Sequence, residues 1–302
     1  MTGASGKIGK SFVDAAMRAG HSLLCLGRRL PPELEGAVDY QYLDFAAPAD
    51  NVAVSEALRS VDTAVHLAAK VDTAPVDSSA ALAMYQINVL GTLHFIQCLA
   101  KADVKHLVLA SAANFYDSRL SIADERSLIR PVSRTLYLSS KAAQEAIARE
   151  CCLNDGIRCA TMRISSVVGA TADGLISRLV GKVMRGEAIT IHSPSFGADF
   201  VTADSVVRGL MTAATQGLEG EFNLSSGTRH TLTDIIALIE ARLGCVANIQ
   251  YSEPTIPPDQ GFPAISCDLL RGMGYEPDPL EMLIDALAQK IERASAAWKP
   301  VR

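Results

Sequence analysis

Two residues of this 302-residue chain, Tyr137 and Lys141, have the types and the spacing of an acid–base pair. They open a segment of helical pattern, so their side chains are expected on one helix face, about 6 Å apart along the axis. A tyrosine with a pKa near 10 is a poor acid–base group at neutral pH, and a neighbouring ammonium lowers that pKa by favouring the phenolate. The pair therefore predicts acid–base catalysis by Tyr137, assisted by Lys141.

A second candidate site is the glycine-rich start of the chain, which has G-x-x-G-x-x-G spacing and leads directly into an amphipathic pattern ending at Gly20. Small residues let backbone N–H groups approach a pyrophosphate, and the N-terminus of the following helix adds partial positive charge. The segment therefore predicts a dinucleotide-binding turn. The residues expected to form it are Gly3, Ser5, Gly6, Lys7, Ile8 and Gly9.

The dinucleotide is indicated by two arginines, Arg28 and Arg29, about 20 residues beyond the glycine turn. An acid at this place binds the ribose 2′-hydroxyl of NAD, whereas arginine accommodates the 2′-phosphate of NADP. No acid occurs there until Glu33, so NADP is favoured over NAD. The alternative is that both arginines simply face solvent.

These residues must be positioned by alternating strands and helices, which predict an α/β fold with a doubly wound parallel sheet of Rossmann type. The expected strands are 22–26, 39–43, 63–67, 106–110 and 158–163, and the expected helices are 7–19, 52–59, 80–100 and 136–153. The dinucleotide-binding domain is expected over 1–165, with 199–226 returning to it. A smaller, mixed substrate-binding domain is expected over 166–302. The second half of the chain is expected to contain helices over 175–185, 204–216, 231–243 and 280–294, a strand over 221–224 and an exposed connection over 254–263.

The strand that should precede the glycine turn is missing from the printed sequence, because only Met1 and Thr2 come before Gly3. That strand belongs at the centre of the sheet, and its absence would leave two neighbouring strands without ladder partners. We therefore expect the natural chain to start further upstream.

Composition excludes several classes of function. The chain is 49% hydrophobic and 20% charged, with a net charge of -5, which argues against nucleic acid as the main partner. No apolar run reaches the roughly 18 residues of a membrane span, and no signal peptide opens the chain. The seven cysteines are scattered, with no metal-ligand spacing, and are expected to be reduced thiols of a cytoplasmic protein.

Taken together, the motifs resemble those of the extended short-chain dehydrogenase/reductase family, of the NAD-dependent epimerase/dehydratase type. The matching segments occur in order, and they are 2–9, Asp44 with Phe45, 66–69, 88–92, Tyr137 to Lys141 with Glu145, 163–169, 199–201, 221–223 and 270–277. The resemblance implies hydride transfer at a carbinol or carbonyl carbon of a sugar-like or other small substrate. It also implies a homodimer through the helices over 80–100 and 136–153.

The resemblance further assigns expected roles to single residues. Asp44, followed by Phe45, should contact the adenine, and Leu67, Ala68 and Ala69 should line the cofactor. Asn88 should brace the site, Ile164 should lie near the nicotinamide, and Lys141 should hold the nicotinamide ribose.

Two departures from the family pattern bear on activity. The position of the catalytic hydroxyl holds Ala112, and loss of such a donor typically costs about 10²–10³ in rate. Ser111 could replace it only if the strand end is bulged or twisted, because neighbouring strand residues face opposite sides; Asn114 or a water is the alternative. Ala198 stands where many sugar-nucleotide enzymes have a diphosphate-binding arginine, which Arg208 or Arg229 would have to replace.

Three functions remain open at this point. The first is an active oxidoreductase or epimerase with Tyr137 as the acid–base residue and Ser111 as a candidate partner. The second is an NADPH-dependent reductase of a small carbonyl compound, favoured by Arg28, Arg29 and Ala198. The third is a dinucleotide-binding sensor or partner protein with weakened catalysis, which Ala112 favours.

Overall fold

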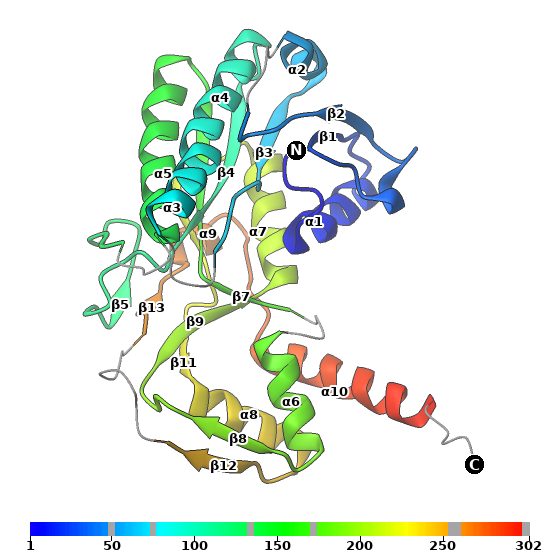
Figure 1. Ribbon diagram of the computed structural model, residues 1–302, viewed down its shortest axis with the longest axis vertical. Helices are drawn as coiled ribbons and strands as arrows, with labels where there is room; N and C mark the ends of the chain where they lie inside the picture. The colour runs from blue at the N-terminus through cyan, green and yellow to red at the C-terminus, as the bar shows by residue number, and fades with distance from the viewer. Residues whose placement is uncertain (48–51, 73–76, 132–135, 170–173, 253–260, 298–302) are drawn as a thin grey trace.

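The structure is a computed structural model that describes residues 1–47, 52–72, 77–131, 136–169, 174–252 and 261–297. An upper layered part is built on a parallel sheet, and a smaller lower part is built from short strands and helices (Figure 1). No helix among the described residues is long and apolar enough to cross a membrane.

The upper sheet is parallel, and its strand order combines two ladders. One ladder joins β1 to β2, and the other has the order β10-β6-β4-β3. The bounds are β1 Leu24–Gly27, β2 Asp39–Tyr42, β3 Thr63–His66, β4 His106–Ala112, β6 Arg158–Ile164 and β10 Gly220–Leu224. The predicted strands of the first half are confirmed to within two residues at each end.

Met1 and Thr2 lie between the two ladders. Thr2 forms parallel bridges with Leu26 of β1 and with His66 of β3, and its N–H donates to Val65 O at 2.9 Å. The full order is therefore β2-β1-Thr2-β3-β4-β6-β10. The expectation that β1 and β3 lack ladder partners is therefore corrected at this one position. The two-residue segment Met1–Thr2 lies between β1 and β3 and supplies ladder contacts to both.

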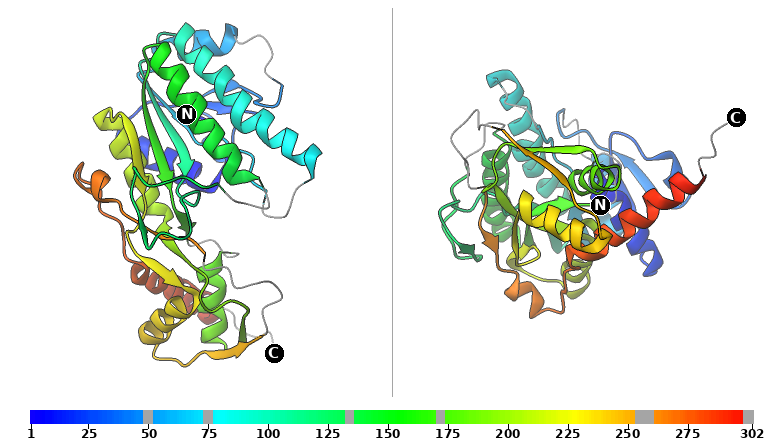
Figure 2. Two further views of the ribbon diagram at one scale, coloured as in Figure 1. Left: turned by 90° about the vertical axis from the view of Figure 1, so that its left-hand side faces the viewer. Right: turned by 90° about the horizontal axis from the view of Figure 1, so that it is seen from below.

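Helices cover both faces of this sheet, as the doubly wound arrangement requires (Figures 1 and 2). One face carries α1 (Lys7–Arg18) and α7 (Ala203–Gln216), and the other carries α2 (Val52–Ala57), α4 (Gly91–Lys101) and α5 (Tyr137–Asn154). Successive side chains of β4 point to opposite faces of the sheet and so contribute to the apolar core on each face. Val108 packs with α1 and α7 on one face. Leu107 and Leu109 pack with α4 and α5 on the other face. The predicted Rossmann-type fold is confirmed.

The single helix expected over 80–100 is divided in the structure. It begins two residues earlier as α3 (Ser78–Tyr85), where Asp77 Oδ1 accepts a hydrogen bond from Ala80 N at 2.8 Å. A π-helical turn, Gln86–Leu90, then leads into α4. Such turns are rare and occur frequently at functional sites, and this one carries the buried Asn88.

The lower part contains strands that the sequence did not predict. One small sheet has the order β11-β9-β7 and another pairs β12 with β8, while β5 pairs with β13 between the two parts. The bounds are β5 Ile122–Ala123, β7 Ser166–Val168, β8 Ala188–Ile191, β9 Gly197–Thr202, β11 Arg229–Thr231, β12 Asn248–Tyr251 and β13 Ala264–Ile265. These strands are two to six residues long, too short to show an alternating pattern, and distant segments complete them.

The helices of the lower part agree with the sequence. They are α6 (Leu175–Met184), α8 (Leu232–Leu243) and α10 (Leu280–Ala297), which share one apolar core, and a short α9 (Asp268–Arg271) precedes α10. Thr231 caps α8 as expected, in a reciprocal capping box with Asp234. Residues 254–260 of the expected connection lie outside the described residues, and Gly261 and Pro263 are buried, not exposed as predicted.

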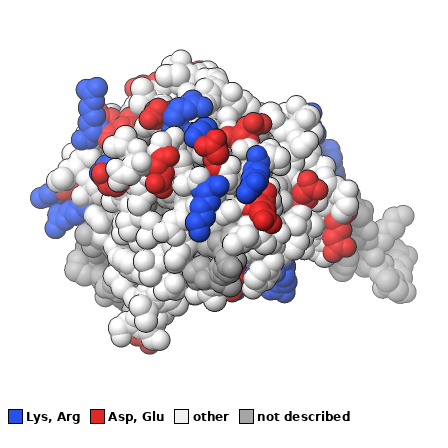
Figure 3. Space-filling model, turned by 90° about the horizontal axis from the view of Figure 1, so that it is seen from above, with Lys and Arg blue, Asp and Glu red and all other residues white. Residues whose placement is uncertain are grey.

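The face seen from above mixes acidic and basic side chains (Figure 3). Blue and red groups alternate there, as expected for a chain with a net charge of -5. That face therefore offers no continuous basic surface of the kind that neutralises phosphates of nucleic acid.

Candidate active site

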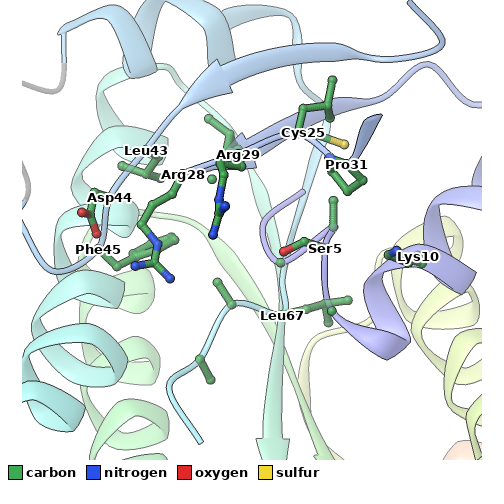
Figure 4. Close-up of a pocket in the computed structure, with 18 of the residues that line it drawn as sticks. Ser5, Lys10, Cys25, Arg28, Arg29, Pro31, Leu43, Asp44, Phe45 and Leu67 are labelled. Atoms are coloured by element: carbon green, nitrogen blue, oxygen red, sulfur yellow. The ribbon is translucent and has the colours of Figure 1, made fainter. Parts of the chain in front are cut away.

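A cavity of about 870 Å³ opens beside the glycine turn at the carboxyl edge of β1 and β3. Figure 4 shows side chains around it from the glycine turn, α1, the end of β1, the end of β2 and the segment after β3. The expected cofactor-binding residues that line it are Gly3, Ser5, Gly6, Arg28, Arg29, Asp44, Phe45, Leu67, Ala68 and Ala69. The chain therefore gathers residues from four separate motifs around one cavity.

The glycine turn is packed too tightly to accept side chains. Gly3 has a φ of +77°, and a Cβ there would lie 2.8 Å from the N of Ala68. A Cβ at Gly9 would lie 2.0 Å from the O of Gly3, because α1 crosses directly against the turn. Gly6 is the N-cap of α1 and provides no side-chain cap, and the N-terminus of a helix favours an anion. This arrangement fits the pyrophosphate of a dinucleotide.

Arg28 and Arg29 extend from the end of β1 into this cavity (Figure 4). Both side chains are exposed, and both also line the cavity. Exposure to solvent is therefore compatible with a role of both arginines in this cavity. Glu33, the first acid after them, forms an ion pair with Lys10 at 2.6 Å on the cavity wall. Sequence reasoning missed Lys10, although its place one helical turn after Gly6 is a signal that could have identified it.

The other expected residues, Lys7, Ile8, Gly9, Asn88, Tyr137, Lys141 and Ile164, do not line this cavity in the described structure. Asn88 is fully buried and reaches two segments at once. Its Oδ1 accepts from Lys70 N at 2.7 Å, and its Nδ2 donates to Lys70 O and to Ser140 Oγ, each at 3.0 Å. The π-helical turn thus ties the segment after β3 to the first turn of α5.

Tyr137 and Lys141 lie on the first two turns of α5. The helix starts abruptly, because Leu136 adopts a left-handed φ of 57°, a conformation that costs free energy for a residue other than glycine. Lys141 is only 3% exposed, and its Nζ donates to Ala110 O at 2.7 Å and to Gln144 Oε1. The helix therefore anchors the ammonium against the carboxyl end of β4.

The protonation states differ from the sequence expectation. Burial raises the pKa of Tyr137 to about 12, so the expected lowering by the lysine is not found. Burial lowers the pKa of Lys141 to about 7, against an opposing effect of the Glu145 carboxylate. The physical reason is that desolvation disfavours both charged forms, and Lys141 directs hydrogen bonds to Ala110 and Gln144.

A buried chain of hydrogen bonds connects the lysine to the glycine turn. Gln144 Nε2 donates to Thr92 Oγ1 at 2.7 Å, Thr92 Oγ1 lies 2.9 Å from His66 Nε2, and His66 Nδ1 lies 2.7 Å from Thr2 Oγ1. Burial lowers the pKa of His66 to about 3, so its ring is neutral at pH 7. His66 therefore acts as a structural link between the two predicted sites.

The structure does not support Ser111 as the replacement for the missing hydroxyl. The register of β4 against β6 is unbroken through Ala112, so no bulge turns Ser111 toward the site. The Ser111 hydroxyl donates to Glu145 Oε2 at 2.9 Å, and Glu145 forms a buried ion pair with Arg163. The hydroxyl proton of Ser111 is thus already donated to the Glu145 carboxylate, and it is not directed to a substrate.

Ala112 instead packs in a small apolar cluster with Phe115 and Leu138, against which Tyr137 also lies. Asn114 follows two residues later, and its Nδ2 donates to Ser166 Oγ at 3.0 Å. Its Oδ1 is buried and lacks a hydrogen-bond partner among the described residues. A polar amide with one unsatisfied end therefore lies close in sequence to the position that lost its hydroxyl.

The arginines considered as replacements at Ala198 lie in different settings. Arg208 pairs with Asp278 at 2.7 Å. Arg229 donates to Ser195 O at 2.8 Å and to Phe262 O at 3.0 Å, and its guanidinium lies against Gly197, where a Cβ would come within 2.6 Å. Arg229 is therefore placed next to the residue that precedes Ala198.

No group of three or more potential metal ligands occurs among the described side chains. The cavity, the tight glycine turn and the tyrosine–lysine helix are therefore the features available for comparison with known proteins.

The chain is similar in sequence to named proteins of other organisms. The chain is 30% identical over 179 residues to a UDP-glucose 4-epimerase of Lactobacillus helveticus, covering 58% of this chain and about half, 53%, of that relative. It is 26% identical over 312 residues to a dTDP-4-dehydro-6-deoxy-D-allose reductase of Streptomyces bikiniensis, covering 96% of this chain and 94% of that one.

A solved structure shows the same fold. MoeE5 in complex with UDP-glucose and NAD superimposes with a TM-score of 0.79 at 23% identity, over 97% of this chain and 98% of that one. The sequence profile of the NAD dependent epimerase/dehydratase family matches residues 1–225. The matched region contains the glycine turn, the cavity residues and the tyrosine–lysine helix, and the chain belongs to the NAD-dependent epimerase/dehydratase family.

Proposed function

We propose that this protein is an NAD(P)-dependent oxidoreductase that transfers a hydride at a carbinol or carbonyl carbon of a sugar-like or other small substrate. The observation that carries the proposal is the place of Tyr137 on the first turn of α5, packed against Ala112 at the end of β4 and four residues before the buried Lys141. A protonated phenol can donate its proton to a carbonyl oxygen that is being reduced. A bound nicotinamide dinucleotide supplies or accepts the hydride.

Lys141 positions this chemistry and does not itself donate the proton. Its Nζ is held on Ala110 O and Gln144 Oε1, which leaves one donor for a ribose hydroxyl. The hydrogen-bonded chain through Gln144, Thr92 and His66 then orients the lysine relative to the glycine turn.

The test is steady-state turnover of the parent and Tyr137→Phe across a panel of sugars, sugar nucleotides and small carbonyl compounds. We expect at least one substrate whose rate falls by about 10² or more in the variant, since a positioned acid contributes about 10²–10⁴. The control is calorimetric cofactor binding, which Tyr137→Phe should retain. If cofactor binds and no substrate shows a Tyr137-dependent rate, the dinucleotide-binding sensor, favoured by Ala112, replaces this proposal.

NADP is the favoured cofactor. Arg28 and Arg29 both line the cavity, and arginine forms bidentate hydrogen bonds with phosphate. Double substitution to alanine should weaken NADPH binding by about tenfold or more and leave NADH binding nearly unchanged. A clear preference of the parent for NADH would refute the assignment.

Asn114 is the group that we assign to the hydrogen bond formerly provided by a hydroxyl at Ala112. The Ser166 hydroxyl can donate or accept, so the Asn114 amide can turn over and present its free N–H₂ to the reacting oxygen. Asn114→Ala should lower kcat in the presence of Ala112, and should matter less in an Ala112→Ser background. Equal losses in both backgrounds would contradict the assignment.

The substrate side favours two classes. The relatives named above act on sugar nucleotides by their names, and we assign the contact with a substrate diphosphate to Arg229, which lies beside Gly197. Ala198 favours a small carbonyl compound without a diphosphate. Comparison of UDP-glucose binding by the parent and by Arg229→Gln separates the two classes. If the substrate is a sugar nucleotide, the substitution should weaken UDP-glucose binding; if it is a small carbonyl compound, no such loss of affinity is required.

The remaining expectations on organisation are also proposals. We assign the dinucleotide-binding domain to 1–165 with 199–226 and the substrate-binding domain to the rest of 166–302, in keeping with the separate apolar core of α6, α8 and α10. A homodimer through α4 and α5 is proposed with exposed Leu82 and Leu90 nearby, and sedimentation of the parent and Leu90→Glu tests it.

A further inference from the structure

A second cavity lies at the amino-terminal edge of the sheet, at the end of α5 furthest from Tyr137. Its volume is about 340 Å³. It is lined by the last turn of α5, the loop into β6, and the first residues of β6 and β10, and none of these residues lines the cofactor cavity. The proposed oxidoreductase chemistry therefore leaves this cavity without a role.

Two thiols, those of Cys152 and Cys159, line this cavity together. Cys152 lies in the last turn of α5 and is 1% exposed, whereas Cys159 is the second residue of β6 and is half-buried. Both side chains belong to the wall of this one cavity, and Cys159 Sγ lies 3.9 Å from Thr161 Oγ1. The helix end and the strand start thus bring two cysteine side chains to the same cavity.

The two cysteines differ in their surroundings, because Cys152 is 1% exposed and Cys159 is half-buried. The neighbouring Cys152 thiol lowers the pKa of the Cys159 thiol, and the Cys159 thiol together with burial raises the pKa of Cys152. Reactive cysteines are those with thiolate character and access to solvent, and redox-sensing ones lie next to a second cysteine that resolves the first product. Cys159 has the first property, and Cys152 has the position for the second.

We propose that Cys152 and Cys159 are a thiol oxidation site at which a small disulfide, such as glutathione disulfide, enters the cavity and converts the pair into an intramolecular disulfide. Cys159 sulfur attacks one sulfur of the small disulfide, whose S–S bond breaks and releases one thiolate. Cys152 sulfur then attacks Cys159 sulfur, expels the second small thiolate and transfers its proton to it. Two protein thiols lose two electrons in total, and one small disulfide becomes two thiols.

The sequence provides a direct readout of this disulfide. Trypsin cleaves after Arg149, Arg158 and Arg163, so Cys152 and Cys159 fall on separate peptides, 150–158 and 159–163. Reduced full-length protein is titrated with glutathione disulfide, blocked with an alkylating agent, digested and analysed by mass spectrometry without reduction. We expect the two peptides to appear linked, and the link to disappear after treatment with dithiothreitol.

Cys151 shares peptide 150–158, so variants assign the partner. Cys151→Ser should keep the link, whereas Cys152→Ser should lose it and accumulate a glutathione adduct on peptide 159–163. The exposed Cys245 serves as the internal measure that oxidant reached the protein. If Cys245 is fully modified while the parent shows no linked peptides, or if the link survives in Cys152→Ser, the proposal is overturned.

Discussion

Replacement of Lys141 by methionine should remove a pH-dependent part of the stability of this protein. The ordinary pKa of lysine, 10.5, is lowered to about 7 at Lys141 because its side chain is 3% exposed. Between these two values the unfolded chain binds a proton that the folded chain has lost. The free energy of unfolding of the parent therefore rises with pH across this window. The difference in free energy of unfolding between the parent and Lys141→Met is least favourable to the parent below pH 7.

The magnitude follows from the two pKa values. Between pH 6 and pH 9 the difference in bound protons integrates to roughly 2 pH units, which corresponds to about 3 kcal/mol. The parent should gain this amount relative to Lys141→Met. The amino group of Met1, whose pKa burial lowers to about 6, titrates in both proteins and cancels in the difference. Tyr137, with a pKa of about 12, affects stability only above about pH 10.

The assay is equilibrium urea unfolding of the parent and Lys141→Met at pH 6, 7, 8 and 9, with Lys101→Met at an exposed lysine as the matched control. The difference between parent and control should stay constant across the series. If the difference between parent and Lys141→Met also stays constant to within about 0.5 kcal/mol, the lysine is not desolvated and the reasoning fails.

Three further outcomes are expected. Gly9→Ala should abolish dinucleotide binding in calorimetry and lower the free energy of unfolding by about 1–3 kcal/mol, because its Cβ would lie 2.0 Å from Gly3 O; normal binding would contradict this. Glu145→Gln should cost about 3–5 kcal/mol in urea unfolding, since it leaves the buried Arg163 without its carboxylate, whereas Glu150→Gln at an exposed site should cost almost nothing. Thr231→Ala should cost about 1 kcal/mol through loss of the α8 cap, and an unchanged urea midpoint would count against the capping box.

Local pattern was sufficient for the upper sheet and its helices. Strands such as β4 are continuous apolar segments buried on both faces, so their composition identifies them without knowledge of their neighbours. The short strands of the lower part could not be predicted in the same way. β9 pairs with β7, which ends 29 residues before β9 begins, and with β11, which begins 27 residues after β9 ends, so no local window contains either pairing.

In the candidate site, too, the features that depend on local sequence could be predicted, and those that depend on distant segments could not. The glycine turn, the two arginines and the tyrosine–lysine helix could be read from spacing, because turn geometry and helical periodicity are local properties. The protonation of Tyr137 and Lys141 could not, since desolvation depends on how distant segments cover a group. The expected lowering of the Tyr137 pKa was wrong for this reason.

The sequence by itself therefore determined the family resemblance, the parallel sheet and the types of residue available to a cofactor. Only the tertiary structure decided that Ser111 bonds to Glu145, that Asn114 Oδ1 is buried without a partner among the described residues, and that Cys152 and Cys159 line one cavity. Each of these is a contact between side chains whose partner is fixed by packing, and packing is a property of the whole fold.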